Sequence, residues 1–273
     1  MNGRIIGIVV IVLFITLFSL VIALGGLGYD LPMERVRLIA RTYLSIAYNP
    51  FNRNYTVMSP EVVTSIVWDF RGLDTLFETV VFYLAIIGSV ALARGLKSSP
   101  PEKKIESYGL SLIVKTVTRI TIGMIIAIAA SIALHGHLTP GGGFQGGAVA
   151  AIAPLLVLVI FSRYYLENLG VKKNVMLAIR SIGLLGIGLT GFSVLLIGLF
   201  SGVNAYVFQN QPKPGAPVGL PYKFNGALIS GTLWFFNLFE MMAVAAGFTI
   251  VFLLLSIPER DVLEQLKEEA DKH

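Results

Sequence analysis

The chain has 273 residues, of which 55% are hydrophobic and only 14% are charged, a composition typical of integral membrane proteins and not of soluble domains. The absence of cysteine excludes disulfides, thiolate-held iron–sulfur clusters and cysteine-rich zinc sites within this chain. The net charge of +5 bears on membrane topology more than on nucleic acid, and we expect no nucleic acid partner.

The hydropathy pattern predicts an all-α, polytopic membrane protein with six transmembrane helices. A spanning helix needs about 20 mostly apolar residues. The first run has no charge from Ile5 to Leu24, and a signal peptide has a shorter apolar core of about 7–15 residues, so we expect an uncleaved anchor helix. The runs that qualify as spans are 5–27, 73–94, 109–134, 144–162, 175–200 and 227–256.

The connection after the first run contains two shorter elements. Residues 36–48 predict a surface helix within a polar segment, 29–59, that carries four arginines. The segment 60–71, PEVVTSIVWDFR, is too short to span a membrane. Pro60 suits the first turn of a helix, and we expect Ser59 to be its N-cap. We therefore expect one short re-entrant or in-plane helix before the second span.

A polar stretch at residues 96–108 divides the chain, because its Pro-Pro pair stops any helix. It separates a two-span unit, 1–95, from a four-span unit, 109–257. The remaining residues, 258–273, form a charged tail with the Glu–Lys spacings of a helix. We expect both the linker and the tail to lie in the cytoplasm.

The distribution of Lys and Arg favours both termini in the cytoplasm, because 14 of the 21 basic residues then lie on the cytoplasmic side. The arginines of segment 29–59 fall on the opposite side, which packing of that segment on a partner subunit would explain. The expected localisation is the plasma membrane, where the chain is multi-pass and contacts lipid.

The stretch between the third and fourth runs, His135–Gly147, reads HGHLTPGGGFQGG and cannot continue a helix. Gly costs roughly 1 kcal/mol and Pro roughly 3 kcal/mol in a helix interior. A helix break at membrane depth survives only where protein packs around it or where it lines a polar cavity. We therefore expect a packed structural break that comprises Pro140, Gly141, Gly142, Gly143 and Phe144.

Two histidines open this stretch, and His is the side chain whose charge can change near neutral pH. His135 and His137 stand at i and i+2, so they would point apart on a helix. They are candidates for helix capping and loop bonding, or for lining a proton or ion path. A metal site would need further ligands, and no third His or Cys lies near, so we predict no bound metal.

A second group of candidate residues begins the second span. Arg71, Asp74 and Glu78 stand at i, i+3 and i+7, so they share one face of a helix. Charged residues inside a membrane are costly and usually mark ion or proton routes. Two interpretations stay open, namely an ion route through Glu78 and an Arg–acid cluster that pins two helices together.

Three further ionisable residues lie in later spans. Lys115 and Arg119 occupy the first turns of the third span, where they either extend to the cytoplasmic headgroups or pair with an acid on another helix. Glu240 is a candidate partner, because it is the only ionisable residue between Lys223 and Glu259 and lies about midway along the last span. An acid at that depth is a functional candidate, and pairing across subunits is the structural alternative.

The stretch HGHLTPGGGFQGG resembles the signature of the B subunit (MnhB/MrpB) of multisubunit Mrp-type sodium/proton antiporters. The region of resemblance runs from about Gly109 to Ile257. Homologues of that subunit occur in the membrane arms of archaeal membrane-bound hydrogenases and sulfur reductases. The family typically carries an acidic residue near the position of Glu240.

The stretch DFRGLDTLFE, residues 69–78, resembles a segment near the C-terminus of the large A subunit of the same antiporters. This resemblance covers roughly residues 60–95. The family usually has glycine where this chain has Phe77, just before the acid. In the family, the Arg and Glu that match Arg71 and Glu78 are associated with ion transport.

The two resemblances together imply a non-catalytic subunit of a multisubunit Na⁺/H⁺-translocating complex. Its partners would be other Mrp-like membrane subunits, its transported ions Na⁺ and H⁺, and it would carry no cofactor of its own. An A-type segment fused to a B-type subunit favours the membrane arm of a redox-driven complex of hydrogenase or sulfane reductase type. The alternatives are a subunit of a stand-alone Mrp antiporter and a purely structural membrane scaffold. A self-sufficient carrier is disfavoured, because the sequence has no internal repeat.

Overall fold

The computed structural model describes residues 3–24, 36–96, 99 and 109–270, and the chain divides into two compact units at residues 42 and 43. The first unit contains α1 (Gly3–Ala23), an apolar helix over most of the first predicted span. Residues 36–48 were predicted as a surface helix, and α2 (Leu38–Ala47) lies within that range. Part of the connection between the two helices lies outside the described residues.

Five long helices form the second unit, and each is long and apolar enough to cross a membrane. They confirm the predicted all-α membrane class, while the count of six spans, which includes α1, stays a prediction. Their ends lie within a few residues of the predicted runs. The five helices are α4 (Gly72–Leu92), α5 (Leu112–Leu134), α6 (Gly143–Ile160), α8 (Lys173–Ser201) and α9 (Thr232–Leu255).

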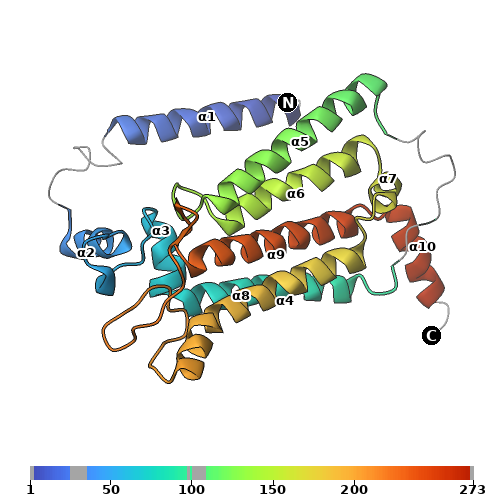
Figure 1. Ribbon diagram of the computed structural model, residues 1–273. Helices are drawn as coiled ribbons and strands as arrows, with labels where there is room; N and C mark the ends of the chain where they lie inside the picture. Colours follow the sequence, from blue (N-terminus) through green and yellow to red (C-terminus); the bar gives the residue numbers. More distant parts are fainter. Residues whose placement is uncertain (1–2, 25–35, 97–98, 100–108, 271–273) are drawn as a thin grey trace. The chain divides into compact units, whose positions relative to one another are not determined.

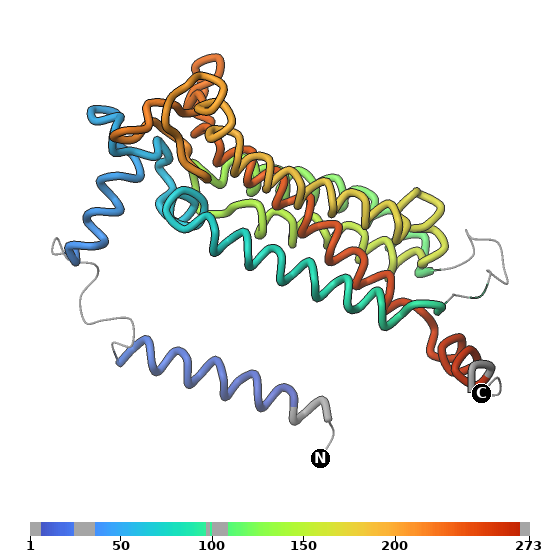
Figure 2. The backbone as a smooth tube through the Cα atoms, turned by 90° about the horizontal axis from the view of Figure 1, so that it is seen from below, coloured from blue at the N-terminus to red at the C-terminus, as the bar shows by residue number. Residues whose placement is uncertain are grey.

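Helix α9 is the centre of this bundle, because it packs along both α8 and α6, while α6 also packs along α5 and α4 lies against α8 and α9 (Figures 1 and 2). Glycines allow the close approach. A Cβ on Gly146 would collide with α5 at Ala133, and a Cβ on Gly147 would collide with α9 at Val244. Adjacent glycines on α6 thus serve opposite neighbours, as in other tightly packed membrane helices.

The segment before α4 was predicted as one short helix, and it forms two distinct pieces. A single α-helical turn, α3 (Val62–Ser65), continues directly into a π-helix, η2 (Ile66–Phe70). The expected N-cap, Ser59, was wrong: the Glu61 carboxylate caps α3 by accepting from the Thr64 N–H. Upstream, a 3₁₀ turn, η1 (Arg53–Tyr55), interrupts the connection to α2.

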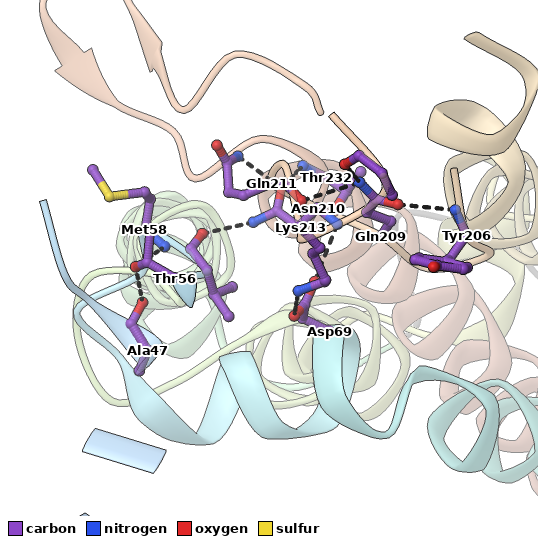
Figure 3. Close-up of polar contacts among 12 residues, drawn as sticks. Ala47, Thr56, Met58, Asp69, Tyr206, Gln209, Asn210, Gln211, Lys213 and Thr232 are labelled. Carbon is purple, nitrogen blue, oxygen red and sulfur yellow. Dashed lines mark hydrogen bonds and ion pairs between the residues drawn. The ribbon is translucent and has the colours of Figure 1, made fainter. Parts of the chain in front are cut away.

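The connection from α8 to α9, residues 202–231, is a folded loop with a polar core (Figure 3). Gln209 donates from Nε2 to three backbone carbonyls, and Asn210 binds the Val57 carbonyl and the Thr232 N–H. A small hairpin of β1 (Lys223–Phe224) and β2 (Ala227–Leu228) turns through Asn225-Gly226, both with positive φ, as this type of hairpin requires.

An aromatic core fastens the loop and η2 to the bundle. The rings of Trp68 and Phe236 stack at 4.3 Å between centroids, and Phe208 also stacks with Phe236, at 5.6 Å. Asp69 adds a polar anchor: its buried carboxylate accepts from the Lys213 ammonium at 2.7 Å and from the Asn210 N–H. We call this end of the bundle, which also contains the turn 135–142, the break end.

The opposite end, called here the tail end, carries two short helices, α7 (Arg163–Asn168) and α10 (Glu259–Ala270). Most of the predicted linker 96–108 lies outside the described residues. Its Ser99 is described, and it donates from its N–H to Asp261 and accepts from the Tyr164 hydroxyl. Ser99 therefore joins α7 and α10 at the tail end.

Candidate functional site

The predicted break is a tight turn between α5 and α6 that covers residues 135–142. Gly143 and Phe144, which were also expected in the break, are instead the first two residues of α6. Gly141 and Gly142 have φ values of 147° and 144°, which residues with a Cβ rarely adopt. The turn also brings two backbone segments into contact, because a Cβ on Gly136 would collide with the Cα of Gly142. The glycines are needed here both for the backbone conformation and for the close approach.

Hydrogen bonds from the segment before α4 hold the turn in place. The Thr64 hydroxyl donates to the Gly136 carbonyl at 2.6 Å, and the Ser59 hydroxyl donates to the His137 carbonyl at 2.7 Å. The Glu61 N–H also donates to the His137 carbonyl. The segment before α4 therefore satisfies backbone carbonyls that the end of α5 leaves open.

The two histidines of the break have different surroundings. His135 is exposed at the C-terminal end of α5 and bonds the Ser131 carbonyl through Nδ1. His137 is buried, and its Nε2 lies 2.8 Å from the Leu228 carbonyl, so Nε2 carries the proton. Burial lowers the pKa of His137, against the opposing effect of this hydrogen bond, and keeps the ring neutral near pH 7.

The break places the N-terminal end of α6 against Glu240 of α9. The Phe144 N–H donates to the Glu240 carboxylate, and the Asn237 side-chain oxygen accepts from the Gly143 N–H at 3.3 Å. The N-terminus of a helix carries unpaired N–H groups and a partial positive charge, which stabilise a carboxylate. The sequence stretch that interrupts the helix thus also supplies the electrostatic partner of a membrane-embedded acid.

A second glutamate shares a cavity with Glu240. The cavity has a volume of about 90 Å³, is largely but not fully enclosed, and has room for a few water molecules. Glu78 of α4 borders it, so one carboxylate comes from each of the two predicted units. The other lining residues are Thr75, Thr79, Phe82, Phe144 and Val244.

Glu78 also borders a groove of about 690 Å³ on the outer face of α4. The groove is open, and its polar lining consists of Arg71, Asp74 and Glu78, all exposed in this chain. The Arg71 guanidinium pairs with Asp74, through a hydrogen bond of 2.6 Å from Nε, and not with Glu78. Glu78 therefore borders both the open, charged groove and the smaller cavity. No arginine of its own helix binds it.

Lys115 and Arg119 lie far from this site. Both cations stack over the ring of Phe161, at 5.9 and 5.5 Å from its centroid, at the C-terminal end of α6. Glu240 contacts the other end of α6, which spans roughly 27 Å at 1.5 Å per residue. The pairing of these cations with Glu240, one of the alternatives offered by the sequence, is therefore absent from the described structure.

One intramembrane charge, Arg180 of α8, was missed by the sequence analysis. It is buried to 1% exposure, and its guanidinium carbon lies 4.9 Å and 5.0 Å from the ring centroids of Phe82 and Tyr83 on α4. A single cation inside the otherwise uncharged run 175–200 was the signal that could have found it.

A larger hollow of about 410 Å³ lies among α5, α6, α8 and α9, near Pro154 and Met241. Its lining is almost entirely apolar, so it offers no chemistry to an ion. In the described ranges, no three side chains of His, Cys, Asp or Glu gather in a metal-binding group. The two glutamates around the smaller cavity are thus the best candidate for an ion-binding site.

The fold and the site define a multi-pass membrane subunit with ionisable residues inside its helix bundle. Residues 113–250, about half of the chain, match the family of domains related to the MnhB subunit of Na⁺/H⁺ antiporters. The chain belongs to this family. The match covers the break, Arg180 and Glu240.

Similarity to individual proteins covers most of the chain. An uncharacterized protein of Methanocaldococcus jannaschii is 25% identical over 235 residues, which cover 78% of this chain and 83% of the relative. A chain of the membrane-bound sulfane sulfur reductase, an archaeal respiratory membrane complex, is 25% identical with a TM-score of 0.54. That match covers 94% of this chain and 97% of the other.

A chain of the Mrp complex from Dietzia sp. DQ12-45-1b has the same fold, with 17% identity and a TM-score of 0.57. The match covers 95% of this chain but only 26% of that longer chain. This chain is therefore an Mrp-like membrane subunit related to components of both an antiporter and a respiratory complex.

Proposed function

We propose that this chain is a non-catalytic subunit of a complex that translocates Na⁺ and H⁺, and that Glu78 and Glu240 lie on the ion path. The observation that carries the proposal is their shared cavity, to which each predicted unit contributes one carboxylate. The family to which the chain belongs is related to a Na⁺/H⁺ antiporter subunit.

The chemistry of such a pair suits cation exchange. Two carboxylates that share one small cavity repel each other, so the doubly ionised state needs a neutralising cation. One proton or one sodium ion neutralises the same excess charge. A pair that takes up either ion, but not both, couples the movement of the two ions in opposite directions.

The open groove on α4 gives Glu78 access to a second subunit. A carboxylate and an ion pair at membrane depth are costly against lipid, and Arg71, Asp74 and Glu78 are exposed there. We infer that another Mrp-like membrane subunit covers this groove and continues the path to Glu78. The remaining apolar surface of α4 then contacts the same neighbour or lipid.

The larger assembly is, on our proposal, the membrane arm of a redox-driven complex. The sulfane sulfur reductase complex contains a chain that this one matches from end to end, whereas the matched Mrp chain is about four times longer than the matched region. Purification of the native complex and identification of its subunits tests this assignment. A set of Mrp-like subunits without any redox subunit would instead assign the chain to a stand-alone antiporter.

Substitution of Glu78 by Gln tests the ion path. Gln keeps the size of Glu and one hydrogen-bond acceptor but cannot ionise, so we expect the complex to assemble and Na⁺-dependent proton movement in vesicles to fall at least tenfold. Glu259→Gln, the same change at an exposed position of α10, is the matched control. Unchanged transport by Glu78→Gln would leave this chain as a structural scaffold, and lost assembly would identify Glu78 as a helix clamp.

A further inference from the structure

Arg180 is buried in the bundle, and no carboxylate among the described residues pairs with it. It follows Lys173 by seven residues, which places it about 10 Å along α8 from the tail end. Its Nε and one Nη nitrogen are buried and have no hydrogen-bond partner in the described part of the chain. An arginine stays protonated even when buried, so this position carries a fixed positive charge.

The charge lies beside one of the residues that line the Glu78–Glu240 cavity. Phe82 lines this cavity, and the guanidinium carbon of Arg180 lies 4.9 Å from the centroid of the Phe82 ring. On α9, Gly247 leaves room for the guanidinium, because a Cβ there would collide with it. Arg180 thus contacts a residue that lines the cavity bordered by both carboxylates.

Few other charges surround the carboxylate pair. Helix α6 has no ionisable residue, and α9 has only Glu240. On α4 the other ionisable groups are Arg71 and Asp74, which neutralise each other, and Tyr83, which stacks on Arg180. The cations of α5 stack on Phe161 toward the tail end. Among the cations of the described helices, Arg180 therefore contacts a residue that lines this cavity, and it forms no ion pair in the described part of the chain.

We propose that Arg180 is a positioning residue for ion exchange, which lowers the proton affinity of the Glu78–Glu240 pair so that Na⁺ can compete with H⁺ near neutral pH. The proposal rests on the proposed function of the pair. As a general scale, a unit charge roughly 10 Å from an acid, at an effective dielectric constant of about 20, changes the midpoint of protonation by about one pH unit. The structural alternative is a clamp in which Arg180 only fastens α8 to α4 by stacking.

The pH profile of transport distinguishes these roles. In vesicles that contain the whole complex, Na⁺-dependent proton movement is measured from pH 6 to 9 for Arg180→Gln, Arg180→Lys and the control Lys172→Gln. The control removes an exposed charge at the N-cap of the same helix. Loss of the buried charge favours the protonated pair, so we expect Arg180→Gln to move the half-maximal pH upward by about one unit. Arg180→Lys and Lys172→Gln should keep the wild-type midpoint.

An unchanged midpoint in an assembled Arg180→Gln complex would overturn the proposal. If the Arg180→Gln complex does not assemble, the Arg180→Lys variant distinguishes the electrostatic role from the clamp. Lysine keeps the charge but loses the planar stacking on both rings. Assembly of the lysine variant with the wild-type midpoint supports the electrostatic role, and failed assembly or a moved midpoint refutes it. Normal transport by the Glu78→Gln variant would refute the proposed function itself. If the Glu78→Gln variant is inactive and the Arg180→Gln variant keeps the wild-type midpoint, only the role of Arg180 is refuted.

Discussion

A single methyl group at Gly143 should disrupt the contact between α6 and α9. A Cβ at this position would lie 2.5 Å from the Asn237 carbonyl oxygen, 2.6 Å from the Glu240 Cβ and 2.7 Å from a Glu240 carboxylate oxygen. Two of these atoms belong to the backbone of α9 or are fixed to it, so they cannot move aside. Gly143 is not among the residues with positive φ, and the effect of Gly143→Ala is therefore purely one of packing.

The expected cost follows from overpacking, which typically destabilises a core by about 1–3 kcal/mol. Gly188→Ala is the matched control, because Gly188 lies within α8 and a Cβ there meets no atom within 4 Å. At an open helical position the same change favours the helix by up to about 1 kcal/mol. The two variants should thus differ in sign, although the chemical change is identical.

The measurement is the fraction of complex that stays intact after heating, followed by size-exclusion chromatography, with vesicle transport assayed in parallel. We expect Gly143→Ala to lower the temperature of half-survival by several degrees and to reduce transport, because the displaced α9 carries Glu240. Gly188→Ala should match or exceed the wild type. If Gly143→Ala is as stable as Gly188→Ala, then α6 does not pack on α9 at this point and the argument fails.

Three further predictions concern other parts of the chain. Asp69→Asn removes the charge that faces Lys213 in a buried site, and we expect faster proteolysis of the loop before α9, with Glu259→Gln unaffected; equal cleavage rates would contradict the anchoring role. Burial lowers the pKa of His137, so at acidic pH the unfolded chain binds more protons at this residue than the folded chain does. Thermal stability should therefore fall as the pH drops below about 6.5. His137→Gln should flatten that dependence, and an unchanged slope would exclude His137 as its source. Single cysteines at Phe224 and Glu264, both exposed, should react with an impermeant reagent from opposite sides of the membrane; labelling from one side would refute the six-span topology.

Hydropathy predicted the long helices well, because length and apolar composition are sufficient to define a membrane helix. The predicted run 73–94 became α4, and the run 227–256 contains α9 with its first residues in the hairpin. The break was predicted from its glycines and proline, which no helix accommodates cheaply. The π-helical continuation of α3 could not be predicted from the sequence, since it depends on the packing of Trp68 against the bundle.

The partners of the intramembrane charges were harder to predict, because they depend on which ends of the helices meet. The sequence offered Lys115 and Arg119 as partners of Glu240 without information on depth. Helices α5 and α6 run in opposite directions from the break, so the start of α5 meets the end of α6, where Phe161 receives both cations. Glu240 lies at the break, and Arg180, an isolated cation in a long apolar run, lies closer to it than either.

The break and the acidic pair depend on each other, and this dependence explains why the glycines are concentrated where they are. Ending α5 and restarting α6 inside the bundle exposes the first N–H groups of α6, and the absence of a side chain at Gly143 lets Glu240 reach them. The same carboxylate borders the cavity that Glu78 enters from the other predicted unit. A continuous helix through 135–147 would leave Glu240 without these donors, and its charge would then be costly at this depth.

The hydrogen bonds from Ser59 and Thr64 to the turn hold α4, and with it Glu78, against the same site. The two predicted units are therefore joined at the point where their carboxylates meet, which is the geometry that a shared ion site requires.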